Sequence, residues 1–155
     1  MDIHEQLSEY FSIWKETDAL YSLFAKLSGI SDTAFWILYC IRQSGENITQ
    51  RDIRKQWSIS KQTVHSALKE LEKKHIIRLS ELEGDRRSKR IFLTEEGYRF
   101  SEKHLDVVCK IEETVFEKMS NSEREAMLRC SEKYLRLFKN ETDKIFAQGG
   151  QDLNG

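Results

Sequence analysis

Proline is absent from the sequence, and this absence bears directly on the fold. Average usage of about 5% would place roughly eight prolines in a chain of this length. Because proline ends or kinks helices, a chain without it can form long uninterrupted helices and has no X-Pro loops. We therefore expect a mainly α fold, and the 155 residues suffice for one structural domain with a hydrophobic core.

Cysteine is scarce, and the sequence has no CxxC pair. Cys40, Cys109 and Cys130 lie far apart, which argues against a zinc ribbon or a disulfide framework and favours a reducing cytoplasm. Each lies within an apolar helical stretch, so we expect buried packing rather than oxidant sensing. The four histidines show no metal-ligand spacing such as HxxxH. The sequence predicts no metal site and no cofactor.

Long apolar runs are also absent. No stretch approaches the roughly 20 apolar residues that span a bilayer, and the first residues, Met1-Asp2-Ile3-His4-Glu5, lack the basic start of a signal peptide. We expect a soluble, cytoplasmic protein with no membrane partner. Residues 148–155 have nothing to bury and are predicted to form a disordered tail.

Motifs of catalysis are missing as well. The sequence contains no Gly-rich phosphate loop, no GxSxG and no HExxH. An enzyme built on this chain would need a site of an unrecognised kind. We therefore expect a binding protein and not an enzyme.

A basic middle between acidic ends is the main feature that the sequence does contain. Residues 49–91 hold 12 Lys and Arg against 6 Asp and Glu, whereas residues 1–48 hold 3 against 7 and residues 92–155 hold 10 against 13. The whole-chain charge of −1 conceals this asymmetry. The pattern is typical of a protein in which one face meets phosphate and the rest repels it.

A short helix is predicted at the start of this basic middle. Thr49 and Asp52 have the spacing of a capping box, in which each side chain accepts from the other residue's backbone N–H. Ile48 and Ile53 have the spacing of a hydrophobic staple. These signals predict a helix over residues 50–57.

A second helix is predicted over residues 61–74, so that the two helices form a reading head over residues 49–74. One face of the second helix is an apolar stripe at positions i, i+3, i+4 and i+7, made of Val64, Ala67, Leu68 and Leu71. The other side is polar and would face the major groove of DNA. Our candidates for contacts with base edges are Lys61, Gln62, Thr63, His65 and Ser66.

A β-hairpin is predicted after these helices, over residues 76–94. Two β-branched or apolar runs, 76–82 and 89–94, flank the turn-rich segment 83–88. A hairpin at this place is the wing of a winged helix-turn-helix, which we expect to occupy residues 31–97. The alternative, that the polar face of the second helix is merely solvated and binds nothing, is disfavoured by the basic charge and by the order of the motifs.

Two helices are predicted before the basic middle. The first lies within residues 1–30 and ends near Gly29. The second starts at a cap formed by Ser31 or Asp32 and runs to about Arg42, behind the reading head.

Two further helices are predicted within residues 98–147. Thr94 caps a long helix whose apolar side continues to Met119, and Ser120 with Glu123 forms the capping box of the last one. Together with the first helix they carry more apolar surface than one small domain needs. We therefore expect the terminal helices to form a homodimer.

This order of parts resembles the multiple antibiotic resistance regulator (MarR) family of bacterial transcription factors over nearly the whole chain. The most specific piece is Asp85-Arg86-Arg87-Ser88-Lys89-Arg90-Ile91-Phe92-Leu93-Thr94-Glu95-Glu96-Gly97, which is similar to the family's wing signature of Asp-x-Arg, then Leu-Thr, then Gly three residues on. Residues 49–53 and 60–74 likewise resemble its two reading-head helices. The resemblance implies a homodimer on pseudo-palindromic promoter DNA, usually a repressor released by a ligand or an oxidant.

The resemblance also assigns roles to the charged residues of the wing. Arg87 matches the arginine that reaches the minor groove in the family, and Asp85 is placed to orient its guanidinium. The other cations are interpreted as phosphate contacts, which position the protein but carry no sequence code. They are Arg51, Lys55, Lys69, Lys73, Arg86, Lys89 and Arg90.

Two positions depart from the family's pattern. Arg54 stands where a small Ala is frequent, and His75 stands where a helix-ending Gly is frequent. His75 is compatible with the fold because His adopts a left-handed backbone more readily than most residues. The family's hydroperoxide sensors carry a reactive Cys near the start of the first helix, and residues 1–28 contain none.

The resemblance further implies a small-molecule effector. In the family, small aromatic ligands bind between the dimer helices and the reading head. Such a pocket could be lined here by Trp14, Trp36, Tyr39 and Phe100, although aromatic residues at helical spacing are more often part of a core. The alternative function is a winged-helix module that binds an acidic protein partner, and strong sequence preference for DNA would separate the two.

Overall fold

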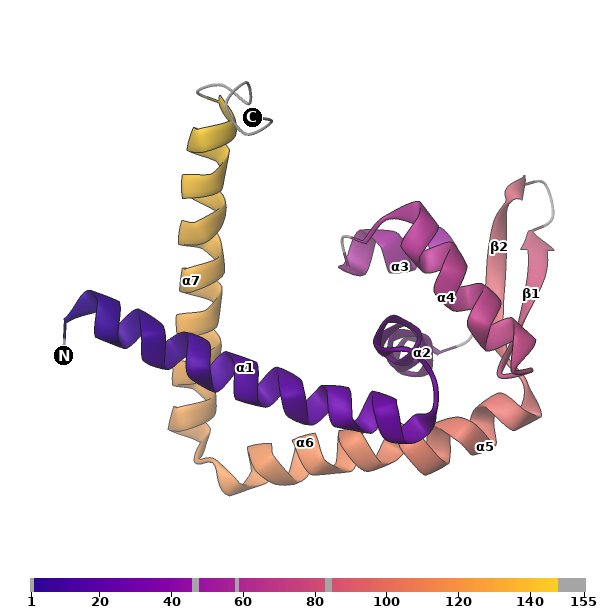
Figure 1. Cartoon of the computed structure of the whole chain (residues 1–155), viewed down its shortest axis with the longest axis horizontal. Coiled ribbons are helices and arrows are strands. Elements are labelled where there is room, and N and C mark those ends of the chain that lie inside the picture. The colour runs from indigo at the N-terminus through magenta and orange to yellow at the C-terminus, as the bar shows by residue number, and fades with distance from the viewer. Residues whose placement is uncertain (1, 46–47, 58, 83–84, 148–155) are drawn as a thin grey trace. The chain divides into compact units, whose positions relative to one another are not determined.

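The computed structural model describes residues 2–45, 48–57, 59–82 and 85–147. It is mainly helical with one two-stranded antiparallel sheet, which confirms the predicted fold class (Figure 1). In chain order the elements are α1 (Ile3–Ser28), α2 (Asp32–Ser44), α3 (Gln50–Trp57), α4 (Lys61–Lys73), β1 (Ile77–Leu82), β2 (Asp85–Leu93), α5 (Glu95–His104), α6 (Asp106–Lys118) and α7 (Asn121–Ala147). The chain divides into two compact units, residues 1–109 and 110–155, which we describe separately.

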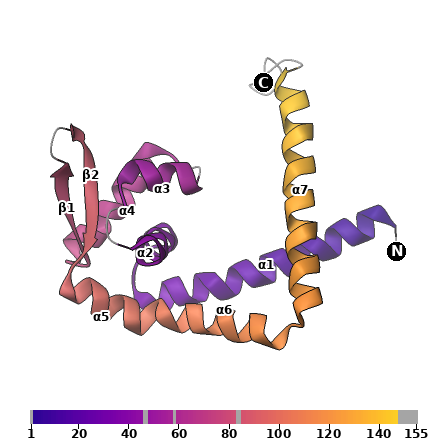
Figure 2. The same ribbon diagram turned by 180° about the vertical axis from the view of Figure 1, so that it is seen from behind.

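Helix α2 is the centre of the first unit (Figure 1). It contacts α1, α4, α5 and β2, and its side chains Phe35 and Leu38 are fully buried. The apolar stripe predicted for α4 faces this core, because Val64, Ala67, Leu68 and Leu71 are all buried. Seen from behind, the β1–β2 hairpin runs beside α4 (Figure 2).

The helix starts follow the capping residues. Ser31 accepts a hydrogen bond from the Ala34 N–H at 3.3 Å, and Ser60 accepts one from the Thr63 N–H at 3.0 Å. At α3 the predicted capping box is confirmed: Thr49 N–H donates to Asp52 at 3.0 Å, and Asp52 N–H donates to the Thr49 hydroxyl at 3.2 Å. These bonds satisfy donors that a helix otherwise leaves unpaired.

The end of α4 has the geometry that the sequence predicted for His75. The backbone there is left-handed, with φ of 57°, and His75 N–H donates to the Glu72 carbonyl at 2.9 Å. Ile76 N–H donates to the Leu71 carbonyl at 2.9 Å, which completes a Schellman motif. The chain therefore turns sharply from α4 into β1.

The hairpin differs from the prediction in its second strand. β2 begins at Asp85, whereas the sequence placed residues 85–88 in a turn. Residues 83–84 lie outside the described residues. The strand is hard to recognise because its first half is polar and charged, and backbone pairing with a neighbouring strand requires no apolar side chain. The pairing register shifts between Glu81 and Leu82.

A short backbone link between the hairpin and the start of the reading head was not predicted. Ile91 N–H donates to the Ile48 carbonyl at 3.0 Å, and Thr49 and Arg90 form an isolated bridge. Ile48 and Ile91 are both buried. The wing is thus tied to the residue that caps α3.

The sequence predicted one long helix from Thr94 to Met119. The structure divides it at Leu105 into α5 and α6, so the prediction of a single helix was wrong. Leu105 has φ of −93° and ψ of −45°, away from ideal helical values. The buried Ser101 hydroxyl donates to the Gly97 carbonyl, four residues earlier, at 2.8 Å. Such back-bonding by serine bends helices, and neither proline nor glycine marks it in the sequence.

The second unit contains the end of α6 and α7. Ser120 and Glu123 form the predicted capping box, with the Ser120 N–H donating to Glu123 at 2.7 Å. The Arg124 guanidinium donates to the carbonyls of Phe116 and Met119 and so closes the turn between the helices. α7 has no buried residue.

Burial of the cysteines follows the prediction only in part. Cys40 is buried, where its Sγ lies 3.0 Å from the Gln56 Oε1. Cys109 is half-buried and Cys130 is exposed, so the expected burial was wrong for Cys130. Cys130 lies on α7, and none of the residues of that helix is buried.

Metal clusters and membrane-spanning helices are both absent from the described residues. No group of three or more His, Cys, Asp or Glu side chains within those residues is placed to hold a metal ion. None of the described helices combines the length and apolar character needed to cross a bilayer. The predicted tail, residues 148–155, lies outside the described residues.

Candidate nucleic-acid interface

The outer face of α4 carries the five candidates for base contacts. Each of them is exposed: Gln62 and Ser66 lie opposite the buried stripe of the same helix, and the others lie between these two faces. The exposed set is Lys61, Gln62, Thr63, His65 and Ser66. The structure therefore gathers these side chains on one accessible helix surface with donors and acceptors suited to base edges.

Thr63 also has a structural task at the helix start. Its hydroxyl lies 2.7 Å from the hydroxyl of the cap residue Ser60, while its N–H donates to the same oxygen. Thr63 thus has less hydrogen-bonding capacity to offer than Gln62 or Ser66. Because the two hydroxyls hold each other, the first turn of α4 is oriented before any partner binds.

A polar depression lies between the face of α4 and the start of α2. Gln62, Thr63 and Ser66 line it together with Ser31, Thr33 and Glu70. Glu70 accepts from the Ser31 N–H at 2.9 Å and from the Ser31 hydroxyl at 2.6 Å. This double contact fixes α4 against the cap of α2. Sequence patterns gave no sign of it, because the two residues lie 39 positions apart.

The basic residues of α3 lie beside the carboxylate of Asp52, which accepts hydrogen bonds from Thr49. Arg51 and Lys55 are exposed. The Asp52 carboxylate accepts from the Thr49 hydroxyl and N–H, and these bonds, helped by Lys55 and Arg51, lower the pKa of Asp52. The hydrogen bonds keep Asp52 at the helix start, where its charge also complements the helix dipole.

The other predicted phosphate contacts lie on two elements. Lys69 and Lys73 are exposed on α4, and Lys89 and Arg90 are exposed on β2. All four can reach solvent, as phosphate contacts must.

The predicted minor-groove contact lies at the tip of the wing. The backbone of Asp85, Arg86 and Arg87 belongs to β2. The side chains of these residues lie outside the described part of the structure, so their assigned roles remain predictions.

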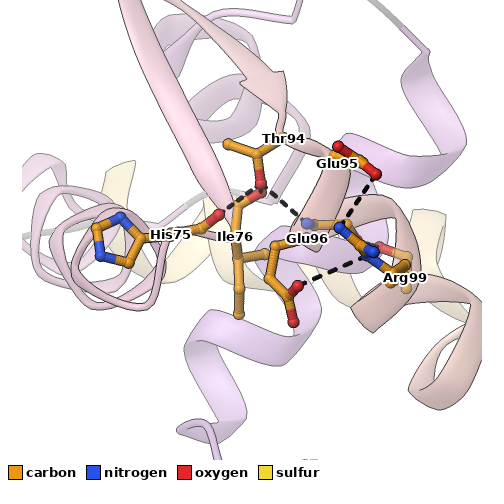
Figure 3. A network of polar contacts seen from close by, with 8 residues as sticks. His75, Ile76, Thr94, Glu95, Glu96 and Arg99 are labelled. Carbon is orange, nitrogen blue, oxygen red and sulfur yellow. Dashed lines mark hydrogen bonds and ion pairs between the residues drawn. The ribbon is translucent and has the colours of Figure 1, made fainter.

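The base of the wing is a compact hydrogen-bond network, shown in Figure 3. The Thr94 hydroxyl donates to the His75 carbonyl and accepts from the Gly97 N–H at 2.9 Å. Thr94 N–H donates to the Ile76 carbonyl at 3.1 Å. A Cβ atom on Gly97 would stand 1.9 Å from the Ile76 oxygen, so only glycine permits this approach.

This network gives a physical meaning to the Leu-Thr-x-x-Gly part of the sequence pattern. Thr94 joins the end of β2 to the turn after α4, and Gly97 lets α5 start directly against that turn. On the outer side Arg99 pairs with Glu95 at 3.1 Å and with Glu96 at 3.6 Å. The direction of the wing relative to α4 is thereby fixed at its base.

The four aromatic residues predicted to line an effector pocket are not all gathered by the structure. Trp36 meets Tyr39, with ring centroids 5.5 Å apart. Phe100 instead meets His104, with ring centroids 4.6 Å apart and ring planes inclined by 44°, and Trp14 is 56% exposed on α1. Trp57, which was not predicted as part of this pocket, has its ring centroid 5.7 Å from that of Trp36.

The comparisons with known proteins point to one family. Residues 28–88, which run from the end of α1 into β2, match a family model described as MarR family. The chain is thus similar to the MarR family over these residues. The resemblance recognised in the sequence is thus confirmed for the part that contains α2, the reading head and most of the wing.

Solved structures of MarR regulators share the fold. A MarR family regulator from Neisseria meningitidis, NMB1585, superposes with a TM-score of 0.74 at 21% identity, over 93% of this chain and 99% of its own. A MarR transcriptional regulator from Methanosarcina mazei Go1 gives 0.63 at 21% identity, over 90% and 98%. The MepR–DNA complex of S. aureus gives 0.64 at 26% identity, over 84% and 96%. No curated protein sequence matches the chain.

Proposed function

We propose that this protein is a transcription regulator that binds double-stranded DNA in a sequence-specific manner. The observation that carries the proposal is the exposed polar face of α4, flanked by basic side chains, within a region that matches the MarR family. A similar chain, MepR of S. aureus, has been crystallised with DNA. In this scheme α4 reads the major groove, and Arg87 of the wing reaches the minor groove with Asp85 orienting it.

We further propose that the protein acts as a homodimer. α1 and α7 expose large apolar side chains, among them Trp14 at 56%, Leu135 at 53% and Phe138 at 60%. Water-exposed apolar surface of this extent is uncommon on a monomer and typical of an interface. A twofold dimer would place two α4 helices in successive major grooves, about 34 to 36 Å apart.

A repressor released by a small-molecule effector is the form of regulation that we favour. It follows from the family's usual mode of action and from the aromatic side chains beside α2. No catalytic role is proposed, since the related structures are named as regulators.

The decisive experiment is selection of bound duplexes from a random DNA pool, followed by a salt titration on the selected sequence. We expect an inverted repeat with half-sites about one helical turn apart and a steep loss of affinity as salt rises. Recovery of no motif, with weak binding at every salt concentration, would favour the winged-helix protein-interaction module instead.

A further inference from the structure

Glu70 is an acidic residue on the helix that we assign to the major groove. It follows Lys69 directly and precedes Lys73 by three positions, and both lysines are exposed. Among the described residues, Glu70 nevertheless forms no ion pair. A carboxylate on a surface that meets phosphate repels DNA. The contacts of Glu70 give a physical reason for its presence there.

Both oxygens of the Glu70 carboxylate accept hydrogen bonds from Ser31. Oε1 accepts from the Ser31 N–H at 2.9 Å, and Oε2 accepts from the Ser31 hydroxyl at 2.6 Å. Because Ser31 is the N-cap of α2, the carboxylate lies at the positive end of that helix, where the dipole favours an anion. Hydrogen bonds to a charged acceptor are about twice as strong as neutral ones. Glu70 therefore connects α4 firmly to the start of α2.

The same contacts occupy donors that the start of α2 would otherwise offer to a phosphate. The Ser31 hydroxyl has one proton, which it donates to Glu70, and its oxygen accepts from the Ala34 N–H at 3.3 Å. Helix N-termini bind phosphate groups because they present unpaired N–H groups and the positive end of a dipole. At α2 this anion position is filled by a carboxylate of the same chain.

The bound carboxylate lies beside side chains that we propose to read bases. The polar depression between α4 and α2 is lined by Glu70, Ser31 and Thr33 together with Gln62, Thr63 and Ser66. Ser66 precedes Glu70 by four positions, about one helical turn. DNA that reaches Gln62 and Ser66 therefore comes close to the Glu70 charge and to the start of α2.

We propose that Glu70 is a specificity-determining residue of the reading head. Its carboxylate fixes α4 to α2 and takes the place of a DNA phosphate at the start of α2, so backbone contacts alone give weak binding. Phosphate contacts are independent of sequence, whereas contacts with base edges are not. Only DNA whose base edges suit α4 compensates for the repulsion by Glu70. This role of Glu70 rests on the proposed function.

The test compares binding of the full chain to two duplexes of equal length and composition, the selected sequence and a scrambled one. Fluorescence anisotropy at several salt concentrations measures both affinities, and their ratio is the specificity. We expect Glu70→Gln to strengthen binding to the scrambled duplex about fivefold and to lower the specificity about tenfold. The salt dependence on the scrambled duplex should become steeper, because the glutamine amide has only one acceptor oxygen and leaves a Ser31 donor for a phosphate.

A matched variant separates this role from a general change of charge. Glu72→Gln removes the same charge from an exposed residue of the same helix, and it should change both affinities by the same factor. A partly unfolded protein also loses both affinities by the same factor, so unfolding leaves the specificity unchanged. A fall in specificity therefore reports on recognition and not on folding.

The partner of Glu70 supplies an independent variant. Ser31→Ala keeps the Glu70 charge and removes one of its two hydrogen bonds, so we expect the specificity to fall about threefold without stronger binding to the scrambled duplex. Ser31→Thr keeps a hydroxyl and should restore the specificity. In a Glu70→Gln protein, Ser31→Ala should have a smaller effect, because the two residues act as a pair.

Two kinds of failure are distinguishable in this experiment. An unchanged specificity in Glu70→Gln, or an equal fall in Glu72→Gln, would overturn the role of Glu70 while the unaltered protein still prefers the selected duplex. Equal binding of both duplexes by the unaltered protein would contradict the proposed function, and the role of Glu70 with it.

Discussion

Helices α4 and α7 carry similar sequence patterns but have different surroundings. Both are amphipathic, and both begin at a serine-based cap. The apolar stripe of α4 is fully covered, with Leu68 at 1% and Leu71 at 0% exposure, whereas α7 has no buried residue and Leu135 is 53% exposed. Amphipathicity therefore identifies a face that needs a partner, and it does not say whether that partner lies in the same chain.

The largest effect expected from this comparison is on folding. Leu68→Ala should lower the free energy of unfolding by about 2–5 kcal/mol, because it opens a cavity in the core. The matched change Leu135→Ala on α7 should leave the unfolding of dilute, monomeric protein nearly unchanged. Chemical denaturation at several protein concentrations measures both. Equal losses for the two variants at low concentration would mean that α7 is covered within its own chain.

A charge introduced on the exposed apolar face of α7 tests whether a second copy of the chain covers that face. Leu135→Glu should abolish the proposed dimer, since a charge would have to be buried against apolar surface, and should weaken binding to a full inverted repeat by at least a hundredfold. Sedimentation equilibrium and DNA titration provide the two measurements. Lys133→Glu, which alters an exposed residue of the same helix, is the control for the change in charge. If the Leu135→Glu protein stays dimeric, the face of α7 that carries Leu135 is not part of the dimer interface.

Gly97→Ala probes how tightly the wing base is packed. The added methyl group would collide with the Ile76 carbonyl, so we expect a loss of about 1–3 kcal/mol in the free energy of unfolding. Thermal denaturation gives the value. Gly29→Ala is an informative comparison, because its Cβ meets nothing within 4 Å although its left-handed backbone, with φ of 75°, carries some strain. A Gly97→Ala loss no larger than that of Gly29→Ala would show that the wing base can relax.

The wing tip should affect DNA binding without affecting folding. We expect Arg87→Ala to weaken binding about tenfold and to reduce the preference for A·T-rich flanks, as removal of a minor-groove arginine should. Arg99→Ala is the control, because Arg99 is paired with Glu95 and Glu96. Titrations of duplexes that differ only in their flanks provide the measurement. Unchanged affinity across salt concentrations would discard the assigned role of Arg87.

The smallest expected effect is the pH dependence of the stability that Asp52 contributes at the start of α3. The pKa of Asp52 is lowered in the folded chain by its hydrogen bonds to Thr49. Its contribution to stability is therefore fully present above the unfolded-state pKa, near 3.8, and is lost as the pH falls through the lower folded value. The difference in Tm between the unaltered protein and Asp52→Asn should shrink between pH 6 and pH 3. A difference that stays constant over this range would contradict the role of the charge.

Much of the reading head followed from local signals. The capping box at Thr49, the apolar stripe of α4 and the left-handed backbone at His75 depend on residues within one or two turns of each other. Such interactions are encoded in short windows of sequence. The division of the helix at Leu105 is also local, but a buried serine is a weak signal compared with proline.

The sequence by itself determined the helices, apart from the break at Leu105, as well as their caps and the basic middle, and it predicts that α1 and α7 need a partner. Only the tertiary structure decided which distant residues meet: Glu70 with Ser31, Thr94 with His75, and Trp36 with Trp57. The physical reason is the separation along the chain of the residues that interact. Caps and helix faces are fixed by neighbours along the chain, whereas these contacts depend on the packing of whole elements around α2, which no local pattern specifies.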